Sequence, residues 1–391
     1  MAEPFRVSIN PELLIWARET SGFSPDEIAS SVGVKPEVLA SWENGEAAPT
    51  WRQLKAIANK TKRPLAAFYL PSAPEKTKKP HDYRTFEGIE PGQFSPALLG
   101  WIREARSLRN RVEELLEEAE VPAFESLPRF TIRNEPRECS RMLREFLGVS
   151  LGDQINWKDQ YTALGAWREI LFEKGVLVVQ LPIAESEARG FSEYHDRISL
   201  VAVSSKEEPY PRIFTIFHEV AHLCVGHTGV SDPRLDIPVR GAHSYIERFC
   251  NRVAAEFLVP IENRLVHDQL CKVAPSGVVD LGALRKASTD LKVSQSALLY
   301  RMVEANLITD AEYAGVLGVW RQRKRGIHKT PAKIPVPVRR IASVGRSYAA
   351  LVFDALDRGR ISTHEACVSL GLRTRWLEDA RLRTYSGAIN V

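Results

Sequence analysis

The chain has 391 residues, a length typical of two to four domains, and its 44% hydrophobic and 26% charged content excludes a disordered or fibrous protein. Its formal net charge of +4 permits contact with nucleic acid but does not require it. Five scattered cysteines, no recognisable signal peptide and no apolar run of membrane-spanning length argue against a secreted or membrane protein, so we expect a cytoplasmic one.

Residues 8–70 contain several short helical stretches separated by sharp stops. The first three end at glycine, and the starting signals are Asn10-Pro11, Ser24-Pro25, Lys35-Pro36 and Pro49-Thr50. Helix, short glycine turn and helix is the helix-turn-helix pattern. The sequence therefore predicts a helix-turn-helix domain over residues 1–72.

This domain resembles the XRE, or Cro/CI repressor-like, family. The resemblance rests on the order and spacing of Glu27-Ile28-Ala29, Gly33-Val34, Leu39, Trp42-Glu43, Gly45 and Pro49-Thr50. It implies DNA binding with residues 35–42 as the reading helix, and the residues best able to touch DNA are Lys35, Ser41, Asn44 and Arg52.

Two departures from the family pattern affect that expectation. Pro25 stands where the family usually has a polar residue that fastens the second helix of the domain to a DNA phosphate. Pro36 offers no hydrogen-bond donor at the start of the reading helix. So few contacts suggest weak direct readout of bases. A module that serves dimerisation or partner binding is therefore kept as the alternative.

A Pro- and Lys-rich stretch, residues 71–80, predicts a linker or an extended strap within a helical region that covers residues 73–157. Long helices are then expected over residues 98–120, 135–147 and 158–174. Two apolar runs, residues 176–180 and 198–203, are typical of buried strands. The second run directly precedes the helix described next, so it either pairs with an extended peptide along its edge or is an ordinary core strand.

Residues 212–225 contain no Gly or Pro, and their apolar side chains on nearly every side predict a buried helix. His218 and His222 are four residues apart, so they share one face. Two histidines and a carboxylate in such a helix are costly unless something compensates them, and zinc does. The pattern His218-Glu219-Val220-Ala221-His222 is the zincin signature, in which Glu219 takes a proton from the metal-bound water as general base.

A catalytic zinc site needs a third protein ligand, which we expect from a second helix over residues 245–260. Glu247 lies on the flank of its apolar stripe, in line with Ala254, whose small size lets another helix approach closely. Glu256 lies about half a turn away, so only one of the two can serve, and Glu247 is the better candidate. Asn251 either accepts a hydrogen bond from a liganding imidazole or is a helix-packing amide.

Residues 160–310 resemble the ImmA/IrrE family of metallopeptidases. Besides the zincin motif, the resemblance rests on Gly190-Phe191-Ser192, Arg212, Thr215, Glu247, Asn251, Ala254-Ala255, Leu258, Pro260, Val293-Ser294, Ala297-Leu298-Leu299-Tyr300-Arg301 and Leu307-Ile308. By resemblance, His218, His222 and Glu247 bind Zn²⁺ and Glu219 is the base, in a peptidase domain over residues 158–320. An XRE-like module in front is a familiar fusion in this family.

The resemblance implies a site-specific endopeptidase that cuts a transcriptional repressor or regulator. Because fused forms also occur beside toxin genes, the alternative is a DNA-binding antitoxin or autoregulator that uses the metallopeptidase fold to hold a toxin partner. A zinc-bound sensor without hydrolysis is a third reading, and a homodimer stays open. The residue that stabilises the transition state is not assigned, and the candidates are Tyr194, His195, Tyr210, Arg212, His227 and His243.

Beyond the peptidase domain, residues 321–340 form a basic, Pro-containing run. Most such runs are solvated linkers, with nucleic-acid contact as the less favoured reading. Residues 341–391 are expected to form a small helical bundle without an assigned role. The predicted fold class is α+β and mostly helical, with an N-terminal helix-turn-helix bundle and a zincin-like metallopeptidase domain that contains a small sheet.

Overall fold

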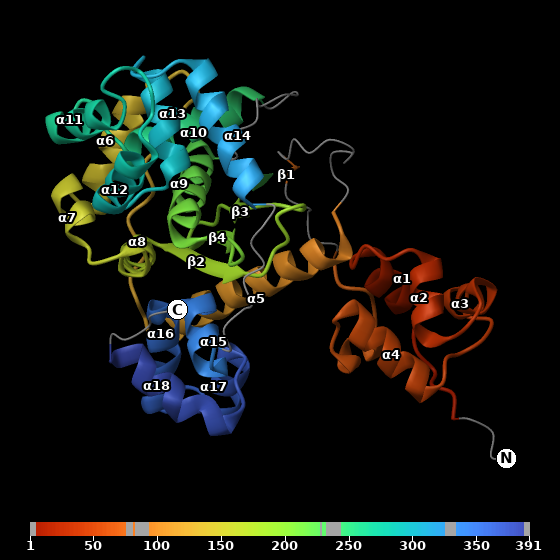
Figure 1. Cartoon of the computed structure of the whole chain (residues 1–391). Helices are drawn as coiled ribbons and strands as arrows, with labels where there is room; N and C mark the ends of the chain where they lie inside the picture. Colours follow the sequence, from red (N-terminus) through yellow and green to blue (C-terminus); the bar gives the residue numbers. More distant parts are fainter. Residues whose placement is uncertain are drawn as a thin grey trace. The chain divides into compact units, whose positions relative to one another are not determined.

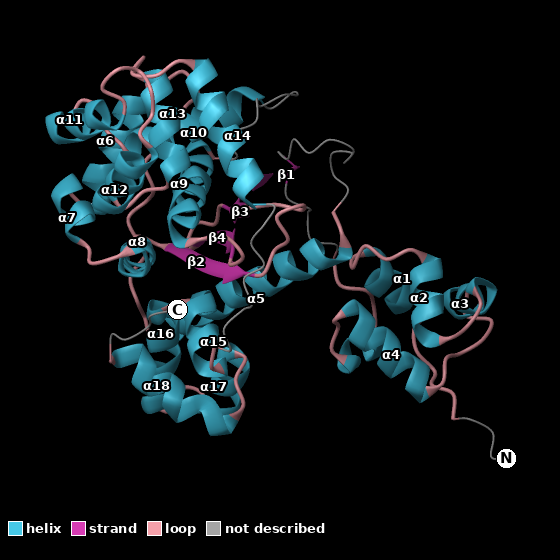
Figure 2. Ribbon diagram, viewed as in Figure 1, coloured by secondary structure: helices cyan, strands magenta, loops and turns pink. Residues whose placement is uncertain are grey.

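A computed structural model of the chain describes residues 5–75, 81–82, 94–226, 229–231, 244–324 and 334–386. The chain divides into two compact units, one of residues 1–79 with 92–104 and one of residues 80–91 with 105–391. The described residues are mostly helical and contain one small mixed sheet (Figures 1 and 2), which confirms the predicted α+β class.

The first unit contains the predicted helix-turn-helix. Its elements are α1 (Pro11–Glu19), α2 (Pro25–Val32), α3 (Pro36–Glu43), α4 (Trp51–Thr61) and the 3-10 helix η1 (Leu65–Tyr69). Capping boxes begin two of the helices, because the side chains of Ser24 and Thr50 each accept a hydrogen bond from the backbone three residues later. Gly33 ends α2 with a φ of +70°, a left-handed conformation that suits glycine. The caps fix where the helices begin and end, and so which residues face the core. The buried core residues include Leu14, Ile28, Leu39, Leu54 and Phe68.

The second unit contains the later part of α5 (Pro96–Glu118) and the sheet. Along the chain, α5 is followed by α6 (Pro136–Leu147), α7 (Leu151–Asn156) and α8 (Gln160–Glu173). The helices from residue 209 to residue 324 are α9 (Pro209–Val225), α10 (Ser244–Leu258), α11 (Arg264–Val273), α12 (Leu281–Leu291), α13 (Gln295–Glu304) and α14 (Asp310–Lys324). The chain continues with α15 (Val336–Val344), α16 (Arg346–Asp357), α17 (Thr363–Leu370), the 3-10 helix η2 (Thr374–Trp376) and α18 (Leu377–Tyr385). Of these helices, α8, α9 and α15 pack against the sheet.

The sheet has the strand order β1-β5-β3-β4-β2 in the described residues. Its strands are β1 (His81–Asp82), β2 (Val176–Leu181), β3 (Gly190–Glu193), β4 (Ser199–Ser204) and β5 (Gly229–Ser231). β2 runs parallel to β4, whereas β3 runs antiparallel to both β4 and β5. Of the two readings of residues 198–203, the structure supports the core strand, because β4 is paired on both sides and offers no free edge to a peptide.

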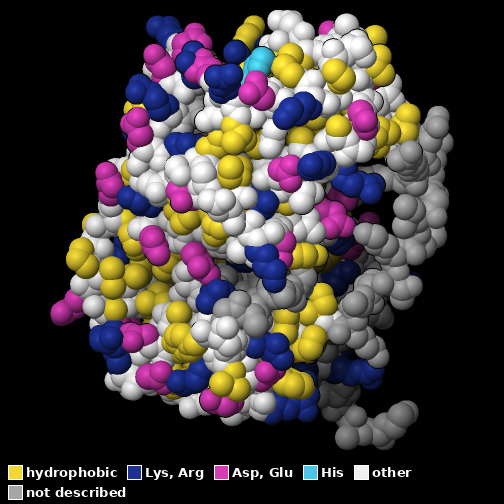
Figure 3. Space-filling model, turned by 60° about the vertical axis from the view of Figure 1, so that its left-hand side comes forward, with side chains coloured by type: hydrophobic (Ala, Val, Ile, Leu, Met, Phe, Trp, Pro, Cys, Tyr) yellow, Lys and Arg dark blue, Asp and Glu magenta, His cyan; other side chains and the backbone are white. Residues whose placement is uncertain are grey.

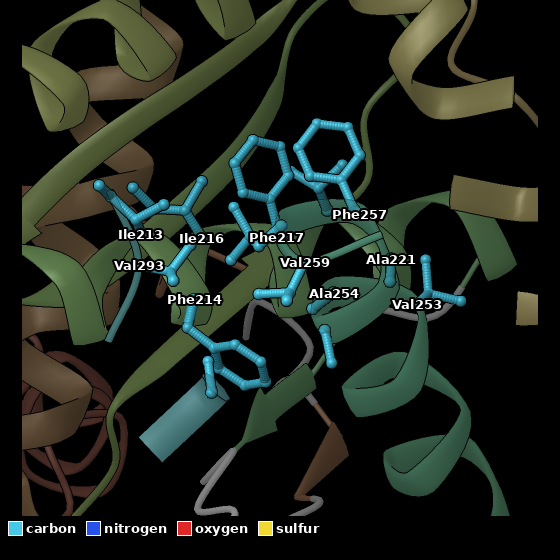
Figure 4. Close-up of a cluster of buried hydrophobic side chains, with 14 of the residues drawn as sticks. Ile213, Phe214, Ile216, Phe217, Ala221, Val253, Ala254, Phe257, Val259 and Val293 are labelled. Atoms are coloured by element: carbon cyan, nitrogen blue, oxygen red, sulfur yellow. The ribbon is translucent and has the colours of Figure 1, made fainter. Parts of the chain in front are cut away.

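A cluster of aromatic rings holds the motif helix in place. The ring centroid of Phe217 on α9 lies 4.7 Å from that of Trp167 on α8 and 4.2 Å from that of Phe257 on α10 (Figure 4). All three side chains are fully buried. α9 also packs against β3 and β4, so the helix is fixed on several sides by the core.

Several expectations fall at or outside the limits of the described residues. His227 and His243 lie outside them, as do residues 76–80 of the predicted linker and residues 325–333 of the basic run. Both ends of that run are helical rather than extended, since α14 continues to Lys324 and α15 begins at Val336. Of the described helices, none combines the length and apolar character needed to cross a membrane.

Candidate metal centre

Two neighbouring helices bring three candidate ligands together. α9 supplies His218 and His222, one turn apart, and α10 supplies Glu247. The two helices pack against each other, with the small side chains of Ala221 and Ala254 buried between their larger neighbours (Figure 4). Small residues let the helix backbones approach, so side chains from both helices can meet.

The donor atoms converge closely. The Nε2 atoms of His218 and His222 lie 3.0 Å apart, and the Glu247 carboxylate oxygens lie 3.4 Å from the first and 3.0 Å from the second. In a tetrahedron with bonds of about 2.1 Å, zinc ligands lie about 3.4 Å from one another. The three groups therefore have the composition and the spacing of a zinc site, and they are the candidate metal cluster among the described residues.

Glu247 contributes an ionised carboxylate to the cluster. Burial raises the pKa of Glu247, but His222 and His218 outweigh it through their charge and hydrogen bonds, and the pKa falls to about 2. The carboxylate is thus ionised at neutral pH. Nearby, burial raises the pKa of the Cys250 thiol, so this side chain stays neutral and serves as core packing.

Glu219 lies beside this cluster and is itself completely buried. The hydroxyl of Ser192, on β3, donates a hydrogen bond of 2.8 Å to its Oε2. In the sequence, Ser192 belongs to the family pattern of residues 190–192 and has no predicted role. A polar residue within a fully buried strand is the signal that could have identified it, because such a group needs a partner.

β3 approaches α9 so closely that one of its positions has no room for a side chain. A Cβ atom on Gly190 would lie 2.8 Å from Cγ2 of Thr215 and 3.0 Å from Oε1 of Glu219. Real carbon contacts are not that short, so only glycine fits without displacement. The glycine thus allows the strand to press against the carboxylate.

An ion pair anchors the other end of β3. Glu193 is 3% exposed, and Nε of Arg106, on α5, lies 2.9 Å from both of its carboxylate oxygens. Burial raises the pKa of Glu193, but hydrogen bonds from His195 and Arg106 outweigh burial and lower it. The partners are 87 residues apart, so no local sequence pattern could pair them.

Other predicted residues are placed differently. Asn251 is buried at 4% exposure, yet its Oδ1 has no hydrogen-bond partner within the described ranges, so the expected bond from an imidazole is not formed there. Glu256 is engaged by Arg301 and is not a ligand. Arg212 donates to the side chain of Gln180 and to two backbone carbonyls, and so holds the start of α9.

The four residues predicted to touch DNA lie at or near the surface of the first unit. Lys35 precedes α3, Asn44 follows it, and Arg52 is the second residue of α4, all with exposed side chains. Ser41 is half-buried, and its hydroxyl donates to the carbonyl of Val38 at 2.8 Å. No cluster of cations forms from these four, and their contacts with DNA remain a prediction.

Comparison with known families gives two matches. Residues 173–302 match the family model described as the IrrE N-terminal-like domain, and residues 14–68 match the model described as helix-turn-helix. No curated protein matches the chain. The first match includes all four residues of the candidate centre, and the two matches occur in the predicted order. The chain therefore carries, in this order, a region that matches the XRE-type helix-turn-helix model and a region that matches the ImmA/IrrE-type model.

Proposed function

We propose that the chain is a zinc-dependent, site-specific endopeptidase coupled to a DNA-binding module, and that its substrate is a transcriptional repressor or regulator. One observation carries the proposal: three buried donors converge at spacings of 3.0–3.4 Å, next to a buried glutamate of the zincin pattern. A purely structural role would leave a carboxylate and two imidazoles buried together without a cation.

His218, His222 and Glu247 are the residues that would hold the metal. Zinc, when bound, polarises the scissile carbonyl and acidifies water. Glu219 accepts the proton of the attacking water on its carboxylate and delivers it to the nitrogen of the leaving amine. Ser192 keeps this carboxylate in position through its hydrogen bond.

The DNA-binding part of the proposal rests on the first unit, whose exposed Lys35, Asn44 and Arg52 can approach phosphates together with Ser41. A cytoplasmic location fits the five cysteines, none of which forms a disulfide. Such a location would give the protein access to both DNA and a repressor.

The test uses purified full-length protein and the products of the genes adjacent to its own. Each product is incubated with the protein, with and without chelator, and any fragments are mapped by mass spectrometry. We expect one product to be cut at a single site, and Glu219→Gln to reduce the rate by about 10²–10⁴-fold while zinc stays bound. Full activity in the glutamine variant would contradict the assignment of the base.

A second function is favoured by the burial of the site. Glu219 and the three donors are at most 2% exposed, so a peptide would need the site to open before it could enter. A regulator that holds a toxin partner on the metallopeptidase fold needs no such opening. The same incubation separates the two: a stable complex with an uncut partner, unaffected by Glu219→Gln, supports the scaffold and contradicts the peptidase.

A further inference from the structure

The C-terminal helices repeat the local structure of the first helix-turn-helix. The repeat is exact in residue spacing: Ser362 follows Ser24 by 338 positions, and Gly371 follows Gly33 by the same number. α2 and α17 each have eight residues, and α1 and α16 each end five residues before the serine. The helix-turn-helix family match at residues 14–68 covers the first copy.

Both copies open with the same capping box. The N–H of Ser24 donates to the Glu27 carboxylate at 2.8 Å, and the N–H of Glu27 donates back to the serine hydroxyl at 3.2 Å. In the second copy, Ser362 and Glu365 form the same two bonds at 2.7 and 3.2 Å. Such reciprocal bonds fix where a helix begins.

The turns also agree. Gly33 has φ +70° and ψ 36°, and Gly371 has φ +61° and ψ 37°. The next residue in each copy donates its N–H back into the helix: Val34 to the carbonyl of Ala29 at 3.0 Å, and Leu372 to that of Cys367 at 2.9 Å. The backbone therefore leaves α2 in the first copy and α17 in the second copy in the same direction.

Burial follows the same register. In the first copy, the residues that face the core are Ile28, Ala29, Leu39 and Trp42. The equivalent residues of the second copy, all buried as well, are Ala366, Cys367, Leu377 and Ala380. α16 packs against α17 and α18, so the second copy has the helical support that the motif needs. Figure 1 shows this group in blue and the first copy in red.

The copies differ in charge at the start of the second helix. Where the first has Lys35, Pro36 and Glu37, the second has Arg373, Thr374 and Arg375. Both arginines are exposed, and neither forms an ion pair with a residue in the described ranges. Arg373 precedes the short helix η2 and Arg375 lies within it, ahead of α18, whose first turn carries Glu378 and Asp379. The two arginines are therefore cations that a phosphate of a nucleic acid can pair with.

The wider region is basic too. Residues 334–386 contain nine arginines, no lysine and five acidic residues. Their net charge is therefore +4, the same as that of the whole chain. The face drawn in Figure 3 intersperses cations with acidic side chains, without a broad area of one sign among the atoms described. Residues 321–333, just before this region, are basic as well, so the basic character of the sequence is concentrated towards its C-terminal part.

We propose that α17, η2 and α18 form a second helix-turn-helix that binds duplex DNA, with Arg373 and Arg375 contacting the phosphate backbone at the start of the reading helix. Because a helix-turn-helix presents the N-terminal residues of its second helix to the major groove, Thr374 lies where a base edge would be read. This site is independent of the peptidase proposal.

The experiment uses full-length protein and selects sites from a pool of random-sequence duplexes, and fluorescence anisotropy then measures affinity for the selected duplex over a salt series. The test variant is Arg373→Ala with Arg375→Ala. The matched control, Arg285→Ala with Lys286→Ala, removes two exposed cations from α12. We expect about a tenfold loss of affinity in the test variant, a salt slope smaller by about 2, and no change in the control.

Two further measurements make each outcome decisive. The lysine pair, Arg373→Lys with Arg375→Lys, keeps the charge and should restore the salt slope. The test variant should also select a shorter site than the wild type. Unchanged affinity and an unchanged site, or no selection of duplex DNA by the wild type, would overturn the proposal. A loss that comes with a lower melting temperature and that the lysine pair does not reverse would also overturn it, since the arginines would then serve packing.

Discussion

The candidate metal centre and the predicted reading surface of α3 are both marked by sequence motifs, but their surroundings differ. Every donor of the centre is at most 2% exposed, whereas Lys35 and Asn44 of the reading surface are exposed. A buried ionisable group must have a compensating partner, so the identity of that partner can be reasoned out. A solvated side chain needs no compensating partner within the protein, so the structure alone does not identify what it binds.

The largest effect is expected from a ligand of the centre. His222→Ala should weaken zinc binding roughly 10³-fold, because three or four ligands share a binding free energy of about 10–16 kcal/mol. Zinc content is measured by mass spectrometry after dialysis. The control is His267→Ala, which removes an exposed histidine from α11. An equal loss of zinc in the control would contradict the assignment of His222 as a ligand.

The next effect concerns the ion pair that anchors β3, in which Glu193 is buried and Arg106 is partly exposed. Arg106→Ala leaves the Glu193 carboxylate without its cation and should cost about 3–5 kcal/mol in the free energy of unfolding, measured by urea denaturation. The exposed pair of Arg264 with Asp268 is the control, and Arg264→Ala should change little. Equal costs for the two variants would show that burial does not set the strength of this pair.

This pair also predicts a pH dependence. The pKa of Glu193 is lowered in the folded state, so its stabilisation is fully present above the unfolded pKa of about 4.3 and is lost as the pH falls through the folded value. The wild type should lose more stability than Arg106→Ala between pH 6 and pH 3. Parallel loss in both proteins would contradict the assignment.

A smaller effect is expected where β3 touches the base. Gly190→Ala should destabilise the fold by about 1–3 kcal/mol, because the new methyl group collides with Thr215 and Glu219. Gly315→Ala on α14 meets open space and should stabilise its helix by roughly 0.5–1 kcal/mol. If both substitutions changed the free energy of unfolding in the same direction, the close approach of β3 to α9 would be contradicted.

The smallest effect belongs to the exposed surface. Lys35→Ala should reduce affinity for duplex DNA by a few-fold and lower the salt slope by about 1, since it removes one phosphate contact. Fluorescence anisotropy measures both quantities, with Lys286→Ala as the control. A loss of a hundredfold would mean that α3 reads DNA far more strongly than its composition suggests.

Features set by local spacing could be predicted from the sequence, whereas features set by tertiary pairing could not. His218 and His222 could be paired because a helix fixes a four-residue spacing, and Glu247 could be proposed because it flanks an apolar stripe. The bond from Ser192 to Glu219 could not, because it joins residues 27 positions apart through a strand whose pairing is tertiary. Whether β4 lies inside the sheet or at its edge could not be decided from the sequence for the same reason.

The second helix-turn-helix shows a different limit. Its capping box at Ser362 and its glycine at Gly371 are both visible in the sequence. The region was nevertheless read only as a helical bundle, because two short helices with a glycine turn occur in many packed folds. The hydrogen bonds and burial of both copies, compared position by position, were needed to identify the repeat.

Anomalous scattering at the zinc edge, recorded on metal-replete crystals of the full chain, tests the central claim most directly. We predict one strong peak between Nε2 of His218, Nε2 of His222 and the Glu247 carboxylate. Metal-replete crystals without a peak at that position would contradict the account.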